Sequence, residues 1–296
     1  MKEALFSILI PSWNNLPFLQ LCIESIRKNS MYQHQIIIHV NDGSDGTLQW
    51  VKEQGVDYTH SVKNVGVCLA MNMMRTKVQT DYMVFLNDDM YVLPGWDKEF
   101  YNEIQSLSDN RFFLSATAIQ PHTGGKSIIL ADYGDSIDNF KEKDLLNHFQ
   151  DYEMSDWMGA TLPPNVVHRD VWDWVGGYSV EYTPGMYSDP DFTAKLWFCG
   201  IRYMKGLSAS RVYHFETKST TRVKKNLGQI QFLMKWGITS SSFRKFVTWR
   251  DTPFDETKVG TINHRKIKFH VLRSRFKALI YLMSKDFGTV KKLWEV

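Results

Sequence analysis

Short apolar runs and helical patterns alternate along the first part of the chain. Three of the apolar runs are typical of strands that are buried on both faces: 5–10, 35–40 and 82–86. In the stretches between them, apolar side chains recur at helical spacing, which predicts helices over 16–28, 47–54 and 66–78. Buried strands separated by helices predict a parallel sheet built from βαβ units, and therefore an α/β fold.

The patterns are less regular in the middle of the chain and become helical again towards its end. The run 112–119 predicts another strand, the polar segment 131–156 predicts a loop-rich surface, and 190–199 predicts a helix. Helices are also predicted over 226–250 and 265–284. The last of these places an apolar stripe opposite basic side chains, so it predicts an amphipathic helix.

The length and composition are those of an ordinary globular protein. The 296 residues are 43% hydrophobic and 23% charged, which excludes a disordered, collagen-like or disulfide-framework chain. The 3 cysteines lack metal-ligand spacing, so we expect them to be reduced and buried. No apolar run reaches the roughly 20 residues of a membrane-spanning helix. The run that ends at Pro11 is too short for a signal peptide, and we expect a cytoplasmic protein.

The net charge of +3 hides an asymmetry along the chain. Residues 1–217 hold 17 basic and 27 acidic side chains, a net charge of −10. Residues 218–296 hold 18 basic and 5 acidic side chains, a net charge of +13. This division predicts two parts, of which the basic one favours an anionic partner such as a membrane surface. A nucleic acid is disfavoured as the partner because the chain has no reader motif and no interleaving of aromatic and basic residues.

Polar clusters follow three of the predicted strands. They occupy 12–15, 41–45 and 87–89, where each strand ends. Because ligands bind outside the carboxyl ends of parallel strands, we expect the clusters to meet in one crevice. Adjacent carboxylates at Asp88 and Asp89 repel each other, and a divalent cation such as Mn²⁺ or Mg²⁺ would relieve this repulsion. No glycine-rich phosphate loop is present, which excludes the common dinucleotide-binding and P-loop classes.

The order and spacing of the motifs resemble those of family 2 glycosyltransferases, over roughly residues 4–217. The motifs are the strand and loop 7–14, the segment 41–47, the set Asn64, Gly66, Ala70 and Asn72, and the triplet 87–89. The resemblance implies a GT-A fold, a Rossmann-like and mostly parallel sheet flanked by helices. In such a fold residues 1–100 would form the nucleotide-binding half and 101–217 the acceptor-binding half. A basic helical extension would follow over 218–296.

The resemblance also implies a donor site and a metal site. The implied donor-binding residues are Pro11, Ser12, Trp13, Asn14, Asp42, Asn64, Gly66 and Asp88. Asp42 would accept a hydrogen bond from the nucleotide base, with an Asx turn as the alternative. Trp13 would offer a packing face, with ordinary core packing as the alternative. The implied ligands of Mn²⁺ or Mg²⁺ are Asp89, Asp88 and His214, and a structural role is the alternative for His214.

An acidic motif in the second half supplies the implied catalytic base. Asp189 matches that base, which takes the proton of the attacking hydroxyl. Asp191 is the alternative base, or an acid that interacts with the helix dipole. Ser188 stands where the family has Glu, and Met71 where many members have Arg, so other cations must neutralise the diphosphate. The candidates are Lys63, Arg75, Lys218 and Arg222, the last two in a segment that is either a basic lid or a solvated loop.

These roles imply a metal-dependent inverting glycosyltransferase of the hexosyl type. It would move a sugar from a UDP-linked donor to a hydroxyl of a glycan or lipid-linked acceptor, in surface polysaccharide synthesis. A non-catalytic nucleotide-sugar-binding protein is one alternative. A sugar nucleotidyltransferase is another, although it would need a glycine-rich loop that 11–15 lacks. Helix 265–284 either lies on an anionic membrane, which makes the protein peripheral on the cytoplasmic face, or packs on the catalytic domain.

Overall fold

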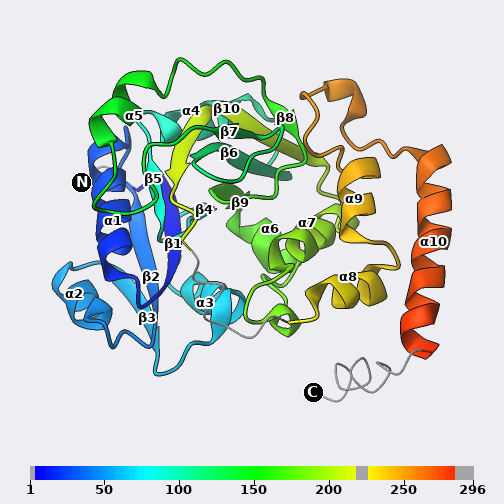
Figure 1. Cartoon of the computed structure of the whole chain (residues 1–296), viewed down its shortest axis with the longest axis horizontal. Helices are drawn as coiled ribbons and strands as arrows, with labels where there is room; N and C mark the ends of the chain where they lie inside the picture. The colour runs from blue at the N-terminus through cyan, green and yellow to red at the C-terminus, as the bar shows by residue number, and fades with distance from the viewer. Residues whose placement is uncertain (1–3, 218–225, 284–296) are drawn as a thin grey trace.

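One mixed sheet forms the centre of the molecule in the computed structural model, which describes residues 4–217 and 226–283 (Figure 1). Its first half is parallel, with strand order β3-β2-β1-β4. These strands are β1 (Phe6–Trp13), β2 (Gln35–Asn41), β3 (Asp57–Ser61) and β4 (Tyr82–Phe85). The three apolar runs near the N-terminus thus form parallel strands, as their composition predicts.

The second half of the sheet mixes strand directions. It continues the order as β9-β6-β10-β5, with β7 on β6 and β8 on β10. The strands are β5 (Met90–Val92), β6 (Phe112–Gln120), β7 (Ile128–Leu130), β8 (Trp157–Met158), β9 (Asn165–His168) and β10 (Tyr203–His214). β9 runs antiparallel to both β4 and β6, and so joins the two halves. β6 and β10 are parallel, so the polar ends of β1, β2, β4, β6 and β10 can meet at one edge.

Helices cover both faces of the sheet. They are α1 (Leu16–Asn29), α2 (Thr47–Glu53), α3 (Gly66–Arg75), α4 (Trp96–Ser106), α5 (Glu142–His148), α6 (Arg169–Trp174) and α7 (Ser188–Phe198). Two short 3-10 helices span Val180–Tyr182 and Glu256–Lys258. The predicted helix 66–78 ends earlier, at Arg75. The segment 131–156, predicted to be loop-rich, contains the helix α5.

Alternation along β1 explains why its sequence is apolar throughout. Side chains on a strand point to opposite faces in turn. Ile8 and Ile10 pack in a cluster with buried residues of α1 and α4, whereas Leu9 packs with buried residues of α3, α6 and α7. All three side chains are fully buried. The sheet is therefore covered on both faces, as a continuous apolar run requires.

The extension after residue 225 adds three helices beside this layer. They are α8 (Gly228–Trp236), α9 (Ser240–Phe246) and α10 (His264–Met283). Ile267 and Val271 of α10 pack against the core cluster that includes α8 and α9. Other apolar side chains of α10 are exposed: Phe269, Leu272, Phe276, Leu279, Ile280 and Met283. Among the described residues, no helix is both long and apolar enough to span a membrane.

Gly206 of β10 provides the space in which Trp157 is buried. A Cβ on Gly206 would lie 1.8 Å from Cε2 of Trp157, which is 2% exposed. The indole Nε1 donates to Oγ1 of Thr117 at 3.1 Å, so the ring cannot turn away without losing a buried hydrogen bond. We expect Gly206→Ala to lower the free energy of unfolding by about 3 kcal/mol, because a well-packed core resists added volume.

Chemical denaturation of the two proteins measures this difference. Gly125→Ala is the matched control, because a Cβ on Gly125 meets no atom within 4 Å. Equal stability of Gly206→Ala and Gly125→Ala would contradict the packing described here.

Candidate functional site

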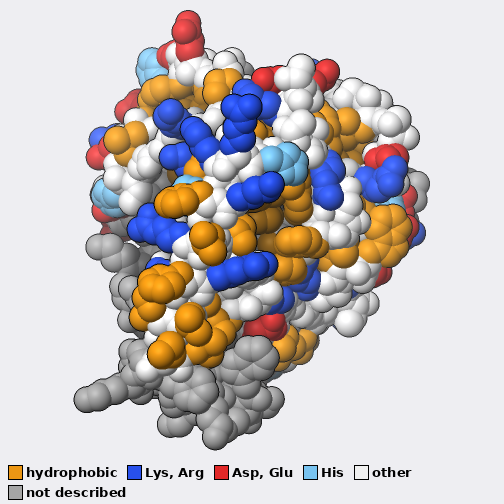
Figure 2. Space-filling view, turned by 90° about the vertical axis from the view of Figure 1, so that its right-hand side faces the viewer, with side chains coloured by type: hydrophobic (Ala, Val, Ile, Leu, Met, Phe, Trp, Pro, Cys, Tyr) orange, Lys and Arg blue, Asp and Glu red, His pale blue; other side chains and the backbone are white. Residues whose placement is uncertain are grey.

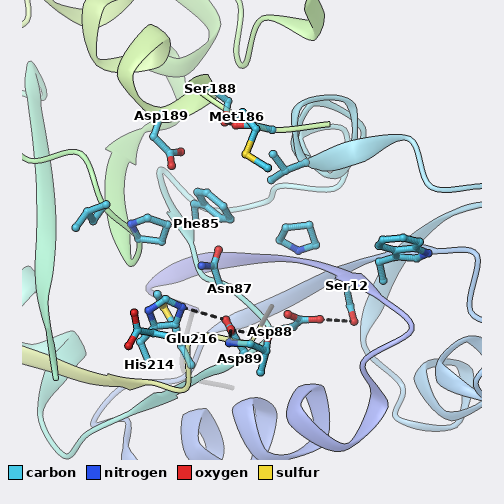
Figure 3. A pocket seen from close by; sticks show the side chains of 18 of the residues that line it. Ser12, Phe85, Asn87, Asp88, Asp89, Met186, Ser188, Asp189, His214 and Glu216 are labelled. Atoms are coloured by element: carbon cyan, nitrogen blue, oxygen red, sulfur yellow. Dashed lines mark hydrogen bonds and ion pairs between the residues drawn. The ribbon is translucent and has the colours of Figure 1, made fainter. Parts of the chain in front are cut away.

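A cavity of about 720 Å³ lies where five strands of the sheet end (Figure 3). Its walls include residues at or just beyond the carboxyl ends of these strands: Trp13 of β1, Asn41 of β2, Asp88 after β4, Gln120 of β6 and His214 of β10. The loop 184–189 and Arg250 of the extension complete the lining. The three polar clusters therefore meet in one crevice, as their positions at strand ends predict.

Most of the expected donor-binding residues line this cavity. Pro11, Ser12, Trp13, Asn64, Gly66 and Asp88 are among its lining residues. Asn14 and Asp42 lie beside it, where Nδ2 of Asn14 donates to Oδ2 of Asp42 at 3.1 Å. Oδ1 of Asn14 accepts from the backbone N–H of Gly43 at 3.0 Å. These bonds connect the ends of β1 and β2, and both Asn14 and Asp42 have left-handed backbone, with φ of 45° and 65°.

Gly66 lets the start of α3 approach the loop that carries the acidic motif. Its φ is +76°, and a Cβ there would lie 2.8 Å from Cα of Pro184. Oδ1 of Asn64 accepts from the N–H of Gly66 at 2.8 Å, which fixes this turn. Asn72, further along α3, exchanges two hydrogen bonds with the backbone of Tyr178 at 2.8 and 2.9 Å. The Asn-Gly motif thus joins the two halves of the cavity wall.

Asp88 and Asp89, the adjacent acids after β4, form hydrogen bonds with different partners. Oδ2 of Asp88 accepts from Oγ of Ser12 at 2.7 Å. Oδ2 of Asp89 accepts from the N–H and Oγ1 of Thr217, at 2.9 and 2.7 Å. Its other oxygen lies 3.5 Å from Nε2 of His214, and Figure 3 shows the two contacts leaving the acids in opposite directions.

Asp89 and His214 favour each other's charged form. Burial raises the pKa of Asp89, but the hydrogen bond and charge of His214, together with the hydrogen bonds from Thr217, bring it below its usual value. Burial lowers the pKa of His214, yet the hydrogen bond and charge of Asp89 raise it above its usual value. Nδ1 of the same ring is 3.0 Å from Oε1 of Gln120, which orients the imidazole.

The donor atoms around Asp89 fit a divalent cation. Carboxylate oxygens suit Mg²⁺ and Mn²⁺, and an imidazole nitrogen suits transition metals. The 3.5 Å between Asp89 Oδ1 and His214 Nε2 is near the roughly 3 Å between neighbouring ligands of an octahedral ion. Across residues 4–217 and 226–283, no three His, Cys, Asp or Glu side chains are grouped closely enough to hold an ion. A cation at this place would therefore take its further ligands from a bound phosphate and water.

Asp189, at the start of α7, faces the cavity from the other side. Figure 3 shows its carboxylate pointing into the space above Asp88 and Asp89. Oδ1 accepts a hydrogen bond from the phenol of Tyr178 at 2.8 Å. Burial raises the pKa of Asp189 to about 6, against smaller lowering effects of Tyr178 and the charge of Arg250. This carboxylate can therefore take up a proton near neutral pH.

Asp191, two residues further on, has its hydrogen-bonding capacity occupied by other side chains. It is fully buried and accepts from Oγ of Ser179 at 2.6 Å and from Nε1 of Trp236 at 2.8 Å. Nζ of Lys235 lies 3.0 Å from Oδ1. Asp191 therefore connects α7 to α8, and it does not line the cavity. These contacts favour Asp189 as the acid available for chemistry.

Lys63 and Arg75, two of the residues expected to neutralise the diphosphate, do not line the cavity. Arg75 pairs with Asp173 outside it, with Nη2 2.6 Å from Oδ2. Lys218 and Arg222 lie outside the described residues. Within the described part of the chain, Arg250 is the single Lys or Arg that lines the cavity. The sequence gives no local signal for it, because it belongs to a basic segment far from every motif.

Comparisons with known proteins concern the family and the fold. The family model described as Glycosyl transferase family 2 matches residues 7–152. S. aureus TarS 1-349 is 14% identical, with a TM-score of 0.53 over 71% of this chain and 60% of that chain. Its complex with UDP-GlcNAc gives 13% identity and a TM-score of 0.51, over 71% and 58%. GalNAc-T7 with UDP, GalNAc and Mn²⁺ gives 12% identity and a TM-score of 0.57, over 98% and 58%.

These likenesses show the fold and leave part of each relative unmatched. The architecture is that of GT-A glycosyltransferase structures, as the motifs imply. The chain spans 60% of the TarS 1-349 chain and 58% of the GalNAc-T7 chain. A search of curated protein sequences found no match.

Because Asp189 and Asp191 have different surroundings, we expect replacement of each by Asn to change the free energy of unfolding in opposite directions. The folded-state pKa of Asp189 is raised, so its ionisation destabilises the fold, fully above about pH 6 and progressively less as the pH falls from about 6 towards the ordinary pKa of 3.8. We expect Asp189→Asn to raise the free energy of unfolding at pH 8 by about 1 to 2 kcal/mol. Asp191→Asn should lower it by about 3 kcal/mol, because Lys235 loses a buried partner.

Chemical denaturation at pH 8 and pH 5 measures both effects. The gain from Asp189→Asn should shrink at pH 5, where the wild-type carboxyl is largely protonated. Equal destabilisation by the two substitutions would contradict the distinction between the acids.

Proposed function

We propose that this chain, which belongs to glycosyl transferase family 2 through residues 7–152, transfers a sugar from a UDP-linked donor to a hydroxyl with inversion of configuration. One observation carries the proposal. A cavity-facing carboxylate with a raised pKa, Asp189, lies across from the paired acids Asp88 and Asp89. A base on one side and a phosphate-binding centre on the other is the arrangement that inverting transfer requires.

The donor end is the part of the cavity formed by β1 and the start of α3. Pro11, Ser12 and Trp13 would contact the nucleoside, and Asn64 and Gly66 would close the opposite wall. Asp88, held by Ser12, would face the ribose or a metal ion. The Asn14–Asp42 pair would meet the edge of the base at the rim. Structures of TarS with UDP-GlcNAc and of GalNAc-T7 with UDP support a uridine nucleotide.

Asp89 and His214 would hold Mn²⁺ or Mg²⁺, with oxygens of the diphosphate and water as the further ligands. Such an ion would neutralise the diphosphate as negative charge develops on it. The Mn²⁺ in the GalNAc-T7 structure supports the choice of metal. The two residues keep their positions through Thr217 and Gln120, so the protein side of the site is formed in advance.

Asp189 would act as the general base. The acceptor hydroxyl gives its proton to the carboxylate, its oxygen forms a bond to the anomeric carbon, and the bond from that carbon to the diphosphate oxygen breaks. The nucleoside diphosphate leaves with the bonding electron pair, and the proton stays on Asp189. Tyr178 orients the carboxylate through its 2.8 Å hydrogen bond. Ser188, which stands where the family has Glu, donates its hydroxyl to the carbonyl of Gly185. It therefore supplies no second carboxylate beside Asp189.

The acceptor would be a glycan or a lipid-linked glycan reached from an anionic membrane surface. Figure 2 shows apolar and basic side chains side by side on the face that carries α10. Between 264 and 283 the sequence has 6 Lys or Arg and no Asp or Glu. Exposed apolar side chains beside cations are the pattern of a helix that lies in the lipid headgroup region. This arrangement favours peripheral attachment, in keeping with surface polysaccharide synthesis on the cytoplasmic face.

Transfer assays with UDP-sugars and Mn²⁺ test the activity. We expect Asp189→Asn to lower the transfer rate about 1,000-fold while UDP binding is kept, because the base is lost and the donor end is intact. The rate constant kcat/KM should fall about tenfold per pH unit below about pH 6. Binding of UDP without turnover of any donor would instead favour a non-catalytic nucleotide-sugar-binding protein.

The pH profile of Tyr178→Phe tests whether Asp189, and not another titrating group, causes the acidic limb. The hydrogen bond from Tyr178 lowers the pKa of Asp189, so its removal should move the acidic limb of the pH profile to higher pH. Tyr203→Phe, which removes a phenol that contacts Glu103 away from the cavity, is the matched control and should leave the limb in place. An unshifted limb in Tyr178→Phe would contradict the assignment of Asp189.

Vesicle sedimentation tests the membrane surface. The double substitution Leu272→Ser and Phe276→Ser should weaken binding to phosphatidylglycerol vesicles at least about tenfold, because each exposed side chain loses its apolar burial. The control replaces Val62 and Trp174 by Ser, since both are exposed apolar residues outside α10. Equal loss in both double variants, or equal binding of the wild type to neutral vesicles, would contradict the proposal.

A further inference from the structure

Arg250 is a buried cation in a cavity whose other charged lining residues in the described part of the chain are four acids and one histidine. The charged side chains around the cavity in the described part of the chain are Asp88, Asp89, Asp189, Glu216 and Arg250, together with His214. The Arg250 side chain is 8% exposed. Burial of a guanidinium is costly unless its N–H donors have hydrogen-bond partners.

The guanidinium has one weak ion pair and no side-chain hydrogen bond of its own among the described residues. Its one ion pair there is the 3.4 Å approach of Nε to Oδ1 of Asp251. That oxygen already accepts from Oγ of Ser127 at 2.5 Å, and Nε is buried without a hydrogen bond. A guanidinium has five N–H donors in a planar fork. Its fork therefore keeps capacity for an additional anionic group at the cavity wall.

The backbone around Arg250 is held firmly. Its N–H donates to the carbonyl of Arg244 at 2.9 Å, and the neighbouring Thr252 accepts from Met158 of β8 at 2.9 Å. Gly159 allows the close contact, because a Cβ there would lie 2.8 Å from Cα of Arg250. The position of this arginine is thus fixed by the sheet, although it comes from the extension.

The residues on both sides of Arg250 have left-handed backbone. Trp249 has φ of 54° and Asp251 has φ of 67°. Such conformations are costly for residues other than glycine, and they persist where the surrounding structure imposes them, often at binding sites. The backbone is thus strained on both sides of Arg250, the residue of the extension that lines the cavity.

Asp189 and Arg250 line the same cavity, and a chain of contacts connects their backbones. Thr193 donates to the carbonyl of Asp189 and contacts Thr161. Thr161 donates to the carbonyl of Gly159, the residue against which Arg250 packs. In keeping with this placement, the charge of Arg250 lowers the pKa of Asp189. Asp189 is the base of the proposed function, so its neighbourhood is the place of the acceptor hydroxyl. The nucleotide end, by contrast, is formed by β1 and its acid partner Asp88.

We propose that Arg250 binds an anionic group of the acceptor, a carboxylate or a phosphate, beside the hydroxyl that Asp189 deprotonates. This inference rests on the proposed function for the assignment of the acceptor end. It names the acceptor class as acidic sugars or sugar phosphates, which no motif in the sequence indicates. A guanidinium fork suits both groups because each offers two oxygens in one plane.

Binding of paired sugars tests the proposal without any turnover. Calorimetry on the full chain, with UDP and Mn²⁺ present, compares neutral methyl glycosides with the corresponding methyl uronides and glycoside phosphates. The wild type should bind the anionic member of at least one pair about 10- to 100-fold more tightly. Arg250→Gln should remove this preference, and Arg250→Lys should restore part of it. Arg244→Gln, a nearby arginine that does not line the cavity, is the matched control and should keep it.

The same variants separate the acceptor from the donor diphosphate as the anion that Arg250 contacts. If Arg250→Gln weakens UDP binding by the same factor, or weakens neutral and anionic sugars equally, the acceptor assignment is wrong. Equal affinity of the wild type for both members of every pair also overturns it. Thermal unfolding of Arg250→Gln and Arg250→Lys establishes that both are folded. Absence of transfer from every donor would overturn the proposed function, while the binding comparison would still decide the role of Arg250.

Discussion

The contact of Asp89 with His214 and Thr217 joins the two halves of the sheet at the cavity. Asp89 lies in the connection from β4 of the parallel half to β5 of the mixed half, and its partners lie at and just beyond the end of β10, which pairs with β5. The contact is buried, so removal of one member would leave an uncompensated charge. Both the acid and the imidazole are kept in their charged forms by each other.

Two acids in one helical turn show how surroundings decide what a carboxylate can do. Asp191 is fully buried, yet Ser179, Lys235 and Trp236 stabilise its charge, and it serves to hold α8. Asp189 has one neutral donor, Tyr178, and burial raises its pKa to about 6. The same residue type is therefore structural at one position and poised for proton transfer at the other.

The predictable parts of the fold are those with a local cause. The apolar runs of β1, β2 and β4 and the motif at 87–89 could be interpreted from sequence because burial and charge repulsion act on neighbouring residues. The antiparallel strand β9 pairs with β4 and β6, which are far from it in the sequence, and no local periodicity predicts this pairing. Asp42, which the resemblance implies as an acceptor from the nucleotide base, lies beside the cavity and is bonded to Asn14, a pairing between two strand ends that no local pattern indicates. Arg250 is brought to the cavity by contacts with β8, more than ninety residues earlier, which no local pattern encodes.

The charge asymmetry along the chain has a physical meaning within the cavity. Among its charged lining residues in the described part of the chain, acids outnumber cations, so an anionic sugar nucleotide would be repelled unless further cations are present. A divalent ion near Asp89 would balance charge at the diphosphate, but it lies on the opposite side of the cavity from Asp189. Charge near Asp189 must be balanced separately, and in the described part of the chain Arg250 is the lining residue able to do so. A neutral acceptor would leave that guanidinium buried and poorly paired in the complex. An anionic acceptor would pair with the guanidinium, so the cost of leaving Arg250 buried and unpaired favours anionic over neutral acceptors.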